Sequence, residues 1–224
     1  MENFQGLFIV GMILFVIAAG AIGWWQAKKR REAFQALAKK LGMRYRAKDH
    51  SVAGRYAFLN KLAQGSNRYA FNLLEGEYQG HPVTAFDYHY ETYSTDSKGR
   101  RQTHHHYFSF FILHQTLYFP ELRIYPESFL SKMGQMLGYD DIDFESIEFS
   151  KAFTVRSTDK KFAYDICHTR MMEYLLSDRA LSVEFEGQCI ALGFDRKLAV
   201  EQFEHRLDQL CKIRELIPDY VYAS

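Results

Sequence analysis

The stretch Arg68–Tyr93 reads RYAFNLLEGEYQGHPVTAFDYHYETY and decides what kind of fold the chain adopts. Runs of aromatic and β-branched residues alternate in it with two turn-like pairs, Glu75-Gly76 and Gln79-Gly80. Runs bounded by such pairs are typical of antiparallel strands joined by short turns. We therefore expect a β-hairpin at the centre of the folded domain.

The residues that follow extend this hairpin into a sheet. The polar segment Ser94–Thr103 predicts a hairpin tip, and HHHYFSFFILH (104–114) predicts the returning strand. Further strands are expected at Leu122–Tyr125, at Phe153–Ser157 and on both sides of a turn at Glu186-Gly187 within 181–194.

Apolar residues at helical spacing predict helices around these strands. One runs from Pro126 through Leu137, one begins at Asp159 behind a cap residue, Ser157 or Thr158, and one spans Leu198–Ile217. The fold class is therefore α+β, with antiparallel β-hairpins packed with helices. We expect residues 43–224 to form one domain, with a possible subdivision in the acidic stretch near 140–150.

An uncharged apolar run, LFIVGMILFVIAAGAIGWW, occupies residues 7–25. A helix of this length spans about 28 Å, close to the thickness of a bilayer's hydrocarbon core. The run begins with Leu7, Phe8 and Ile9 and closes with Trp24 and Trp25, whose rings favour the lipid–water interface. The sequence therefore predicts a tail (1–6), a single transmembrane helix (7–25) and a basic juxtamembrane helix (26–42) that stops at Gly42.

Basic residues directly after the span predict its orientation. Lys28, Lys29, Arg30 and Arg31 follow it, whereas only Glu2 is charged before it. Positive charge stays in the cytoplasm, so we expect the N-terminus outside and the domain in the cytoplasm, at the inner (plasma) membrane. The alternatives are a cleaved signal peptide, against which the charge order argues, and a buried core helix.

Composition and motifs exclude several classes of function. With 28 basic and 27 acidic residues the formal charge is +1, which argues against nucleic-acid binding. The sequence contains no G-x-S-x-G elbow and no phosphate-binding P-loop. Cys167 and His168 are neighbours on a predicted helix and point about 100° apart, a poor arrangement for activating a thiol. We therefore predict no catalytic residues and no enzyme.

The histidines are the strongest candidates for a binding site. If the hairpin register is centred near Ser97 and Lys98, His89 faces His106 and Glu91 faces His104, so that these four side chains can bind zinc or another divalent metal. A slip of one residue would destroy this arrangement. The alternative is a solvated hairpin end whose histidines stack among tyrosines. The basic tip residues Lys98, Arg100 and Arg101 either contact anionic headgroups or are simply solvated.

Three segments carry a resemblance to a known family. The basic-flanked N-terminal anchor, NLLEGEYQGHPVTAFDYHY (72–90) and FSKAFTVRSTDKKFAYDICHTRMMEYL (149–175) resemble a bacterial family of membrane-anchored proteins classed as a domain of unknown function. The resemblance implies a membrane-anchored α+β architecture and carries over no catalytic residue.

Taken together, these patterns predict a non-enzymatic binding or scaffolding domain at the membrane. The expected partners are membrane lipids and another membrane or cytoplasmic protein, and the small residues Ala19 and Gly23 in the anchor also allow a homo-oligomer. Two alternatives stay open: a metal-binding or metal-sensing protein, whose divalent ion would be its one cofactor, and a small-molecule or lipid-binding module.

Overall fold

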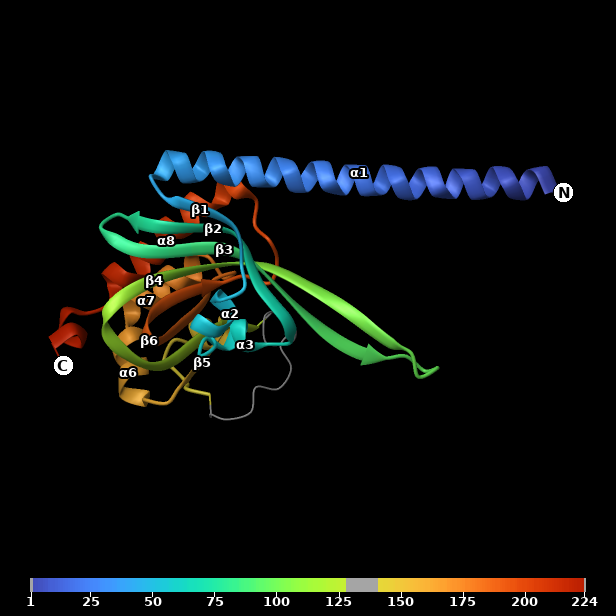
Figure 1. Ribbon diagram of the computed structural model, residues 1–224. Helices are drawn as coiled ribbons and strands as arrows, with labels where there is room; N and C mark the ends of the chain where they lie inside the picture. The colour runs from blue at the N-terminus through green and yellow to red at the C-terminus, as the bar shows by residue number, and fades with distance from the viewer. Residues whose placement is uncertain (1, 128–140, 224) are drawn as a thin grey trace.

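One long helix and a six-stranded antiparallel sheet form the framework of the described part of the chain, residues 2–127 and 141–223 of the computed structural model (Figure 1). The long helix, α1, spans Glu2–Leu41. The strands are β1 (Arg44–Asp49), β2 (Ser66–Tyr78), β3 (His81–Thr95), β4 (Arg101–Pro126), β5 (Phe153–Ser157) and β6 (Ser182–Gly193). The helices are α2 (Val52–Arg55), α3 (Asn60–Ala63), α5 (Ile147–Ala152), α6 (Lys160–Ile166), α7 (Thr169–Ser177) and α8 (Phe203–Leu216), with 3₁₀ turns η1 (Val200–Gln202) and η2 (Asp219–Ala223). The predicted α+β fold class is confirmed.

The sheet is built around one very long strand, β4. Strands β1 to β4 pair in chain order, and the first half of β4 pairs with β3 from Val83↔Leu113 to Thr95↔Arg101. On its other edge β4 pairs with β6, from Phe110↔Gly193 to Ile124↔Val183, and its last residues also pair with β5. The stretch near 140–150, the candidate subdomain boundary, therefore lies between two strands of the same sheet.

Helices cover the two faces of the sheet unequally. The larger hydrophobic cluster lies between one face and the second half of α1 together with α5 to α8, whereas α2 and α3 cover a smaller cluster on the other face. Because side chains alternate along a strand, Val83 and Ala85 of β3 join the larger cluster and Phe86 and Tyr88 join the smaller one. This alternation decides on which face each polar side chain lies.

The second half of α1 packs on the domain, and its first half projects beyond it (Figure 1). Phe34 and Ala38 are buried in the larger cluster, where the Phe34 ring meets Phe203 edge-on at 4.7 Å between centroids. As expected, the helix stops at Gly42, whose φ of 67° lets the Met43 N–H donate to the Ala38 carbonyl at 2.9 Å.

Several expected elements differ from the structure. The predicted hairpin at Glu186-Gly187 is wrong: β6 is one continuous strand, in which Gly187 (φ 60°) coincides with an irregular register against β4. The predicted strand Leu122–Tyr125 is the end of β4. The helix expected from Asp159 divides into α6 and α7 where His168 takes an extended backbone, and Asp159 itself caps α6. Most of the helix predicted over 126–137 lies outside the described residues.

Candidate functional site

A buried ion pair fastens α1 to the sheet. The Asp87 side chain on β3 is fully buried, and Arg30 donates to its two oxygens through Nε and Nη2 at 2.8 Å each. Nη2 also donates to the Leu198 carbonyl at 2.8 Å. The Ser109 hydroxyl (2.8 Å) and Asn72 Nδ2 (3.2 Å) complete the hydrogen bonds to this carboxylate. A two-pronged pair of this kind fixes the orientation of the arginine, and with it the direction in which α1 leaves the domain. Arg30 therefore has a structural role besides its predicted one in topology.

A histidine–glutamate cluster lies on the same face, further along β3. His89 and Glu91 follow Asp87 at intervals of two, and His105 lies opposite Glu91 on β4. His89 Nε2 is 3.1 Å from His105 Nδ1, and Glu91 Oε1 is 3.4 Å from His105 Nδ1 and 4.0 Å from His89 Nε2. The three side chains thus present one ligand atom each to a common point, a group able to hold a metal ion.

The environment of His89 fixes the state of its ring. The ring is buried between Tyr69 and Tyr107, at centroid distances of 4.6 and 4.8 Å. His89 Nδ1 lies 3.1 Å from the Asn67 carbonyl, to which it must donate, so Nε2 carries the lone pair. Burial lowers the pKa of His89 below its usual value, which favours this neutral form.

Asn67 also positions the carboxylate of the cluster. Its Nδ2 donates to Glu91 Oε1 at 2.6 Å, and the Tyr93 hydroxyl donates to Glu91 Oε2 at 3.0 Å. The hydrogen bond from Asn67 lowers the pKa of Glu91, keeping it ionised. Asn67 holds these contacts with a φ of 47°, in a region of backbone conformation that few residues other than glycine adopt.

The structure corrects the residues predicted for a metal site. The register predicted for β3 and β4 was wrong by one residue: His89 lies opposite Tyr107, and Tyr90 lies opposite His106. His104 and His106 therefore point to the other face, where they contact the Ser94 hydroxyl at 2.7 Å and the Thr92 hydroxyl at 2.8 Å. Only His89 and Glu91 of the four predicted ligands come together, and His105 replaces the other two.

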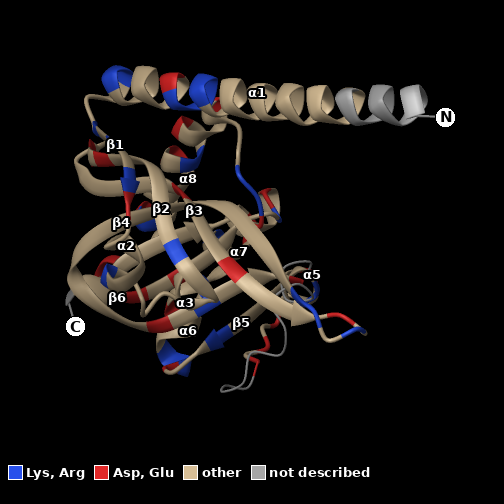
Figure 2. Cartoon of the chain, turned by 45° about the vertical axis from the view of Figure 1, so that its right-hand side comes forward, with Lys and Arg blue, Asp and Glu red and all other residues tan. Residues whose placement is uncertain are grey.

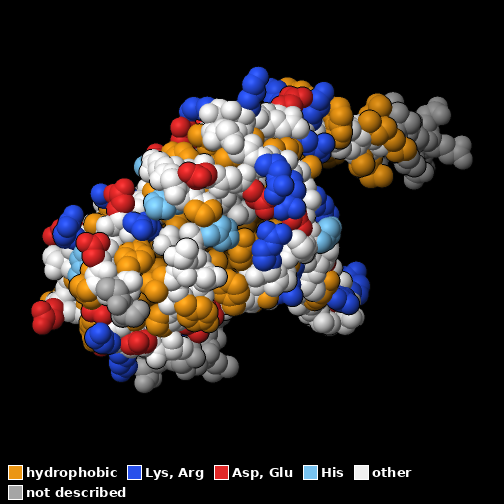
Figure 3. Space-filling view, turned by 60° about the vertical axis from the view of Figure 1, so that its left-hand side comes forward, with side chains coloured by type: hydrophobic (Ala, Val, Ile, Leu, Met, Phe, Trp, Pro, Cys, Tyr) orange, Lys and Arg blue, Asp and Glu red, His pale blue; other side chains and the backbone are white. Residues whose placement is uncertain are grey.

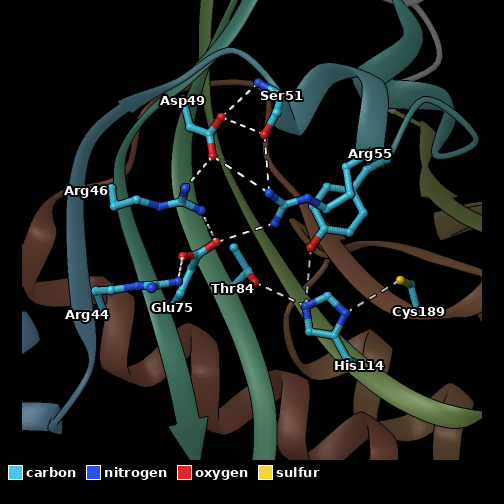
Figure 4. A network of polar contacts seen from close by, with 10 residues as sticks. Arg44, Arg46, Asp49, Ser51, Arg55, Glu75, Thr84, His114 and Cys189 are labelled. Carbon is cyan, nitrogen blue, oxygen red and sulfur yellow. Dashed lines mark hydrogen bonds and ion pairs between the residues drawn. The ribbon is translucent and has the colours of Figure 1, made fainter.

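A separate polar network crosses β1, β2 and α2 (Figure 4). Arg46 pairs with both Asp49 and Glu75, and Arg55 of α2 reaches the same two carboxylates at 3.8 and 3.5 Å. Burial acts to raise the pKa of Glu75, but hydrogen bonds from Arg46 and Arg44 lower it overall. Ion pairs that join α2 to the sheet in this way hold the cover of the smaller cluster in place, and we assign the network a structural role.

Next to this network lies a cysteine–histidine pair that the sequence does not reveal, because its members are 75 residues apart. Cys189 Sγ is 4.0 Å from His114 Nδ1, and Thr84 Oγ1 is 3.1 Å from His114 Nε2 (Figure 4). Burial raises the pKa of the Cys189 thiol to about 12 and lowers that of His114, so both groups are neutral at pH 7. The pair is therefore not an activated nucleophile.

Cys167 and His168 do not form a catalytic pair. Burial raises the pKa of the Cys167 thiol far above its usual value, and His168 Nε2 instead donates to the Leu216 carbonyl at 2.8 Å. Cys167, Cys189 and Cys211 are all buried free thiols.

A cleft of about 300 Å³ opens between residues 117–120 of β4, α6 and η2. Buried Phe119 and Phe162 line it, and Tyr118 and Tyr220, exposed by 74% and 57%, stand beside them. The Tyr220 hydroxyl donates to Asp165 at 3.1 Å. The space-filling view of the end of the domain away from the projecting half of α1 shows hydrophobic side chains gathered among charged ones (Figure 3). Exposed aromatic rings beside a cleft are typical of binding surfaces.

The projecting part of α1 has the character of a membrane anchor. Within the described residues one helical segment, Gly11–Leu41, is long and apolar enough to cross a membrane, and none of its apolar window is buried. That apolar window is therefore not part of the domain's core. Trp24 and Trp25 are exposed, with the Lys28 and Lys29 ammonium groups 5.6 and 3.7 Å from their ring centroids. The predicted anchor residues Leu7, Phe8 and Ile9 lie outside the side chains that the structure describes.

Comparison with known proteins shows a likeness in fold alone. No protein-family model matches the chain, and a search of the curated proteins finds no match either. Among solved structures, the chain is similar to the mycobacterial trehalose monomycolate transport factor A, TtfA, with a TM-score of 0.60 and 16% sequence identity. The match covers 86% of this chain and 96% of that one.

Proposed function

We propose that this chain is a single-pass inner-membrane protein whose cytoplasmic domain is non-enzymatic and binds a partner protein. Residues 7–25 would form the anchor, with the N-terminus outside, because the basic residues Lys28, Lys29 and Arg31 follow it on the domain side. This is the membrane-anchored architecture implied by the resemblance to the bacterial domain of unknown function.

The observation that carries the proposal is the fastening of α1 to the sheet by Arg30 and Asp87. A flexible tether is enough to keep a domain near a membrane, whereas a helix locked to the sheet also fixes which surface faces away from the bilayer. That surface includes the cleft beside Tyr118 and Tyr220, because α6 and the C-terminal end of the chain lie at the end of the domain opposite the projecting half of α1 (Figure 1). Aromatic side chains of this kind are the usual anchors of protein interfaces.

The β3–β4 hairpin is the second oriented feature. Its outer part leaves the domain on the same side as the projecting half of α1 in both ribbon views (Figures 1 and 2). The hairpin runs beside the projecting half of α1, so with the anchor in a bilayer the basic tip residues Lys98, Arg100 and Arg101 would reach the membrane. Each basic residue near an anionic surface contributes about 1 kcal/mol, so the tip would steady the domain against the membrane.

A lipid-binding module is the second candidate, and the fold comparison favours it. The similar structure is that of a mycobacterial transport factor for trehalose monomycolate. Native mass spectrometry of the full chain, released from membranes in mild detergent, would detect a co-purifying lipid and so distinguish the two candidates.

Site-specific photo-crosslinking in cells tests the partner-binding proposal. A photoreactive phenylalanine analogue would replace Tyr118 or Tyr220 in the full chain, and exposed Glu201 on η1 would serve as the control position. We expect both cleft positions to capture the same protein and Glu201 to capture none. Absence of any protein adduct from the cleft would refute the proposal, and robust turnover by the purified full chain in a broad substrate screen would refute its non-enzymatic part.

A further inference from the structure

We infer that His89, Glu91 and His105 form a binding site for a single divalent transition-metal ion, with Zn²⁺ as the best match. This site goes beyond the proposed partner binding and does not depend on it. The three side chains come from two paired strands, and their ligand atoms all lie within 4.8 Å of one another.

The spacing of the ligand atoms suits a tetrahedral ion. Nitrogen and oxygen ligands lie about 2.0–2.2 Å from zinc, which places neighbouring ligands of a tetrahedral ion about 3.4 Å apart. The separations here are 3.1, 3.4 and 4.0 Å, so they bracket that value. The 4.0 Å separation joins His89 and Glu91, so a small rotation of the Glu91 carboxylate, together with one of the exposed His105 ring, would bring all three atoms to one ion.

The surrounding groups hold the ligands in the form that a metal requires. The Asn67 carbonyl accepts the Nδ1 proton of His89 and leaves Nε2 free to bind, and Asn67 Nδ2 holds the Glu91 carboxylate. Such outer contacts, which fix the tautomer and direction of a ligand, are a regular feature of metal sites. Asn67 is thus a positioning residue for two of the three ligands.

The site is open on one side. The His89 side chain is 2% exposed and that of His105 is 52% exposed, so an ion can enter from solvent past His105. Three protein ligands leave a fourth position for water or for a group from another molecule. Two neutral imidazoles and a carboxylate favour Zn²⁺, Co²⁺ or Ni²⁺ over Mg²⁺ or Ca²⁺, which prefer oxygen ligands.

The register of the hairpin supplies matched controls for the test. The full chain, purified in mild detergent without a histidine tag and stripped with a chelator, would be titrated with Zn²⁺ by calorimetry and with Co²⁺ by visible absorption. We expect one ion per chain and the absorption of a tetrahedral Co²⁺ site. His105→Ala and Glu91→Gln should each lower the affinity at least tenfold, whereas His104→Ala and His106→Ala, on the opposite face, should leave it unchanged.

Asn67→Gly tests the positioning role separately. It removes the side-chain contact to Glu91 while keeping the backbone carbonyl, so the affinity should fall about tenfold and the Co²⁺ spectrum should shift. Thermal melting of each metal-free variant shows whether the fold is intact. The inference is overturned if the wild-type chain binds no stoichiometric ion, or if His104→Ala and His106→Ala weaken binding as much as His105→Ala.

Discussion

Arg30 shows how one residue can have two roles of which the sequence displays one. Within the run Lys28 to Arg31 it is one positive charge among four, and the topology prediction treats all four alike. In the folded chain its guanidinium is largely buried against Asp87, 57 residues away. No local pattern predicts this contact, because it depends on which face of α1 meets which face of β3.

Replacing Asp87 by Asn should destabilise the fold strongly, because Arg30 would stay buried without its counter-charge. Breaking such a pair costs about 3–5 kcal/mol, and the 19% exposure of the Arg30 side chain favours the lower end. For a chain of this size about 3 kcal/mol lowers the melting temperature by roughly 6–12 °C. Circular dichroism of the full chain in detergent would measure the shift. Glu148→Gln is the control: it breaks the exposed ion pair with Arg179 and should lower the free energy of unfolding by about 1 kcal/mol or less. Equal shifts in melting temperature for the two variants would contradict the structural role assigned to the Arg30–Asp87 pair.

His114 should make the stability of the fold depend on pH. Burial lowers the pKa of His114 in the folded chain below its ordinary value of 6.5, so the unfolded chain takes up its proton first as the pH falls. The contribution of neutral His114 to the free energy of unfolding is therefore fully present above about pH 6.5 and is lost progressively as the pH falls below it. His81, His89 and His106, whose pKa values are also lowered by burial, act in the same direction.

We expect His114→Gln to lose less stability than the wild type between pH 7 and pH 5.5, as measured by urea unfolding at fixed temperature. His205→Gln, at an exposed position on α8, should keep the wild-type dependence. A His114→Gln profile parallel to that of the wild type would mean that His114 is not responsible.

At the level of elements, the sequence predicts the pairing of β3 with β4 but misses its register by one residue. Thr95 pairs with Arg101, so the turn has an odd number of residues, whereas a centre between Ser97 and Lys98 assumes an even number. Two local features fix the odd turn: the Asp96 carboxylate accepts from the N–H groups of Lys98 and Arg100, and Gly99 has a φ of 76°. One residue of slip then decides which histidines share a face, so the metal ligands could be predicted only in part.

The false hairpin in β6 has a related cause. A glycine with positive φ serves both tight turns and strand irregularities, so Glu186-Gly187 alone does not tell them apart. The smaller hydrophobic cluster was missed for another reason: α2 and α3 have four residues each, too few for helical periodicity to show. Long elements were predicted more closely: the expected span and juxtamembrane helix form the single helix α1, which begins at Glu2 within the expected tail, and the helix expected over Leu198–Ile217 is α8, which begins later, at Phe203.

Gly65 should be essential to the base of the hairpin arm, the outer part of the β3–β4 hairpin. A Cβ at this position would lie 2.4 Å from the Glu91 carbonyl oxygen, and the φ of 65° adds strain for any other residue. Gly65→Ala should therefore cost about 2–5 kcal/mol, the sum of backbone strain and overpacking. Gly99→Ala is the matched control, since Gly99 also has a positive φ but open space around it, and it should cost only about 1–2 kcal/mol. Thermal melting compares the two variants. Similar losses of stability would show that the β3 backbone at Glu91 shifts to make room for the added methyl group, which would contradict the prediction.

For the whole molecule, the arrangement of parts would give the protein a membrane side and a free side if α1 is anchored as proposed. The projecting half of α1 and the hairpin arm leave the domain together, whereas the C-terminus lies at its other end (Figure 1). The chain's own cysteines cannot report which side of the membrane the domain occupies, because all three are buried in the folded domain. That burial leaves an engineered thiol as the reactive one.

Glu173→Cys, at an exposed position on α7, is therefore a specific reporter of orientation. If the domain is cytoplasmic, a membrane-impermeant maleimide should fail to label this thiol in intact cells and should label it in inverted membrane vesicles. Asn3→Cys, before the span, should behave in the opposite way. Changing Lys28, Lys29 and Arg31 together to Gln should weaken the bias, because these residues carry three of the four positive charges that follow the span; Arg30 is left unchanged so that its ion pair with Asp87 is kept. Labelling of Glu173→Cys in intact cells would place the domain outside, and the basic residues would then act at the membrane surface without determining topology.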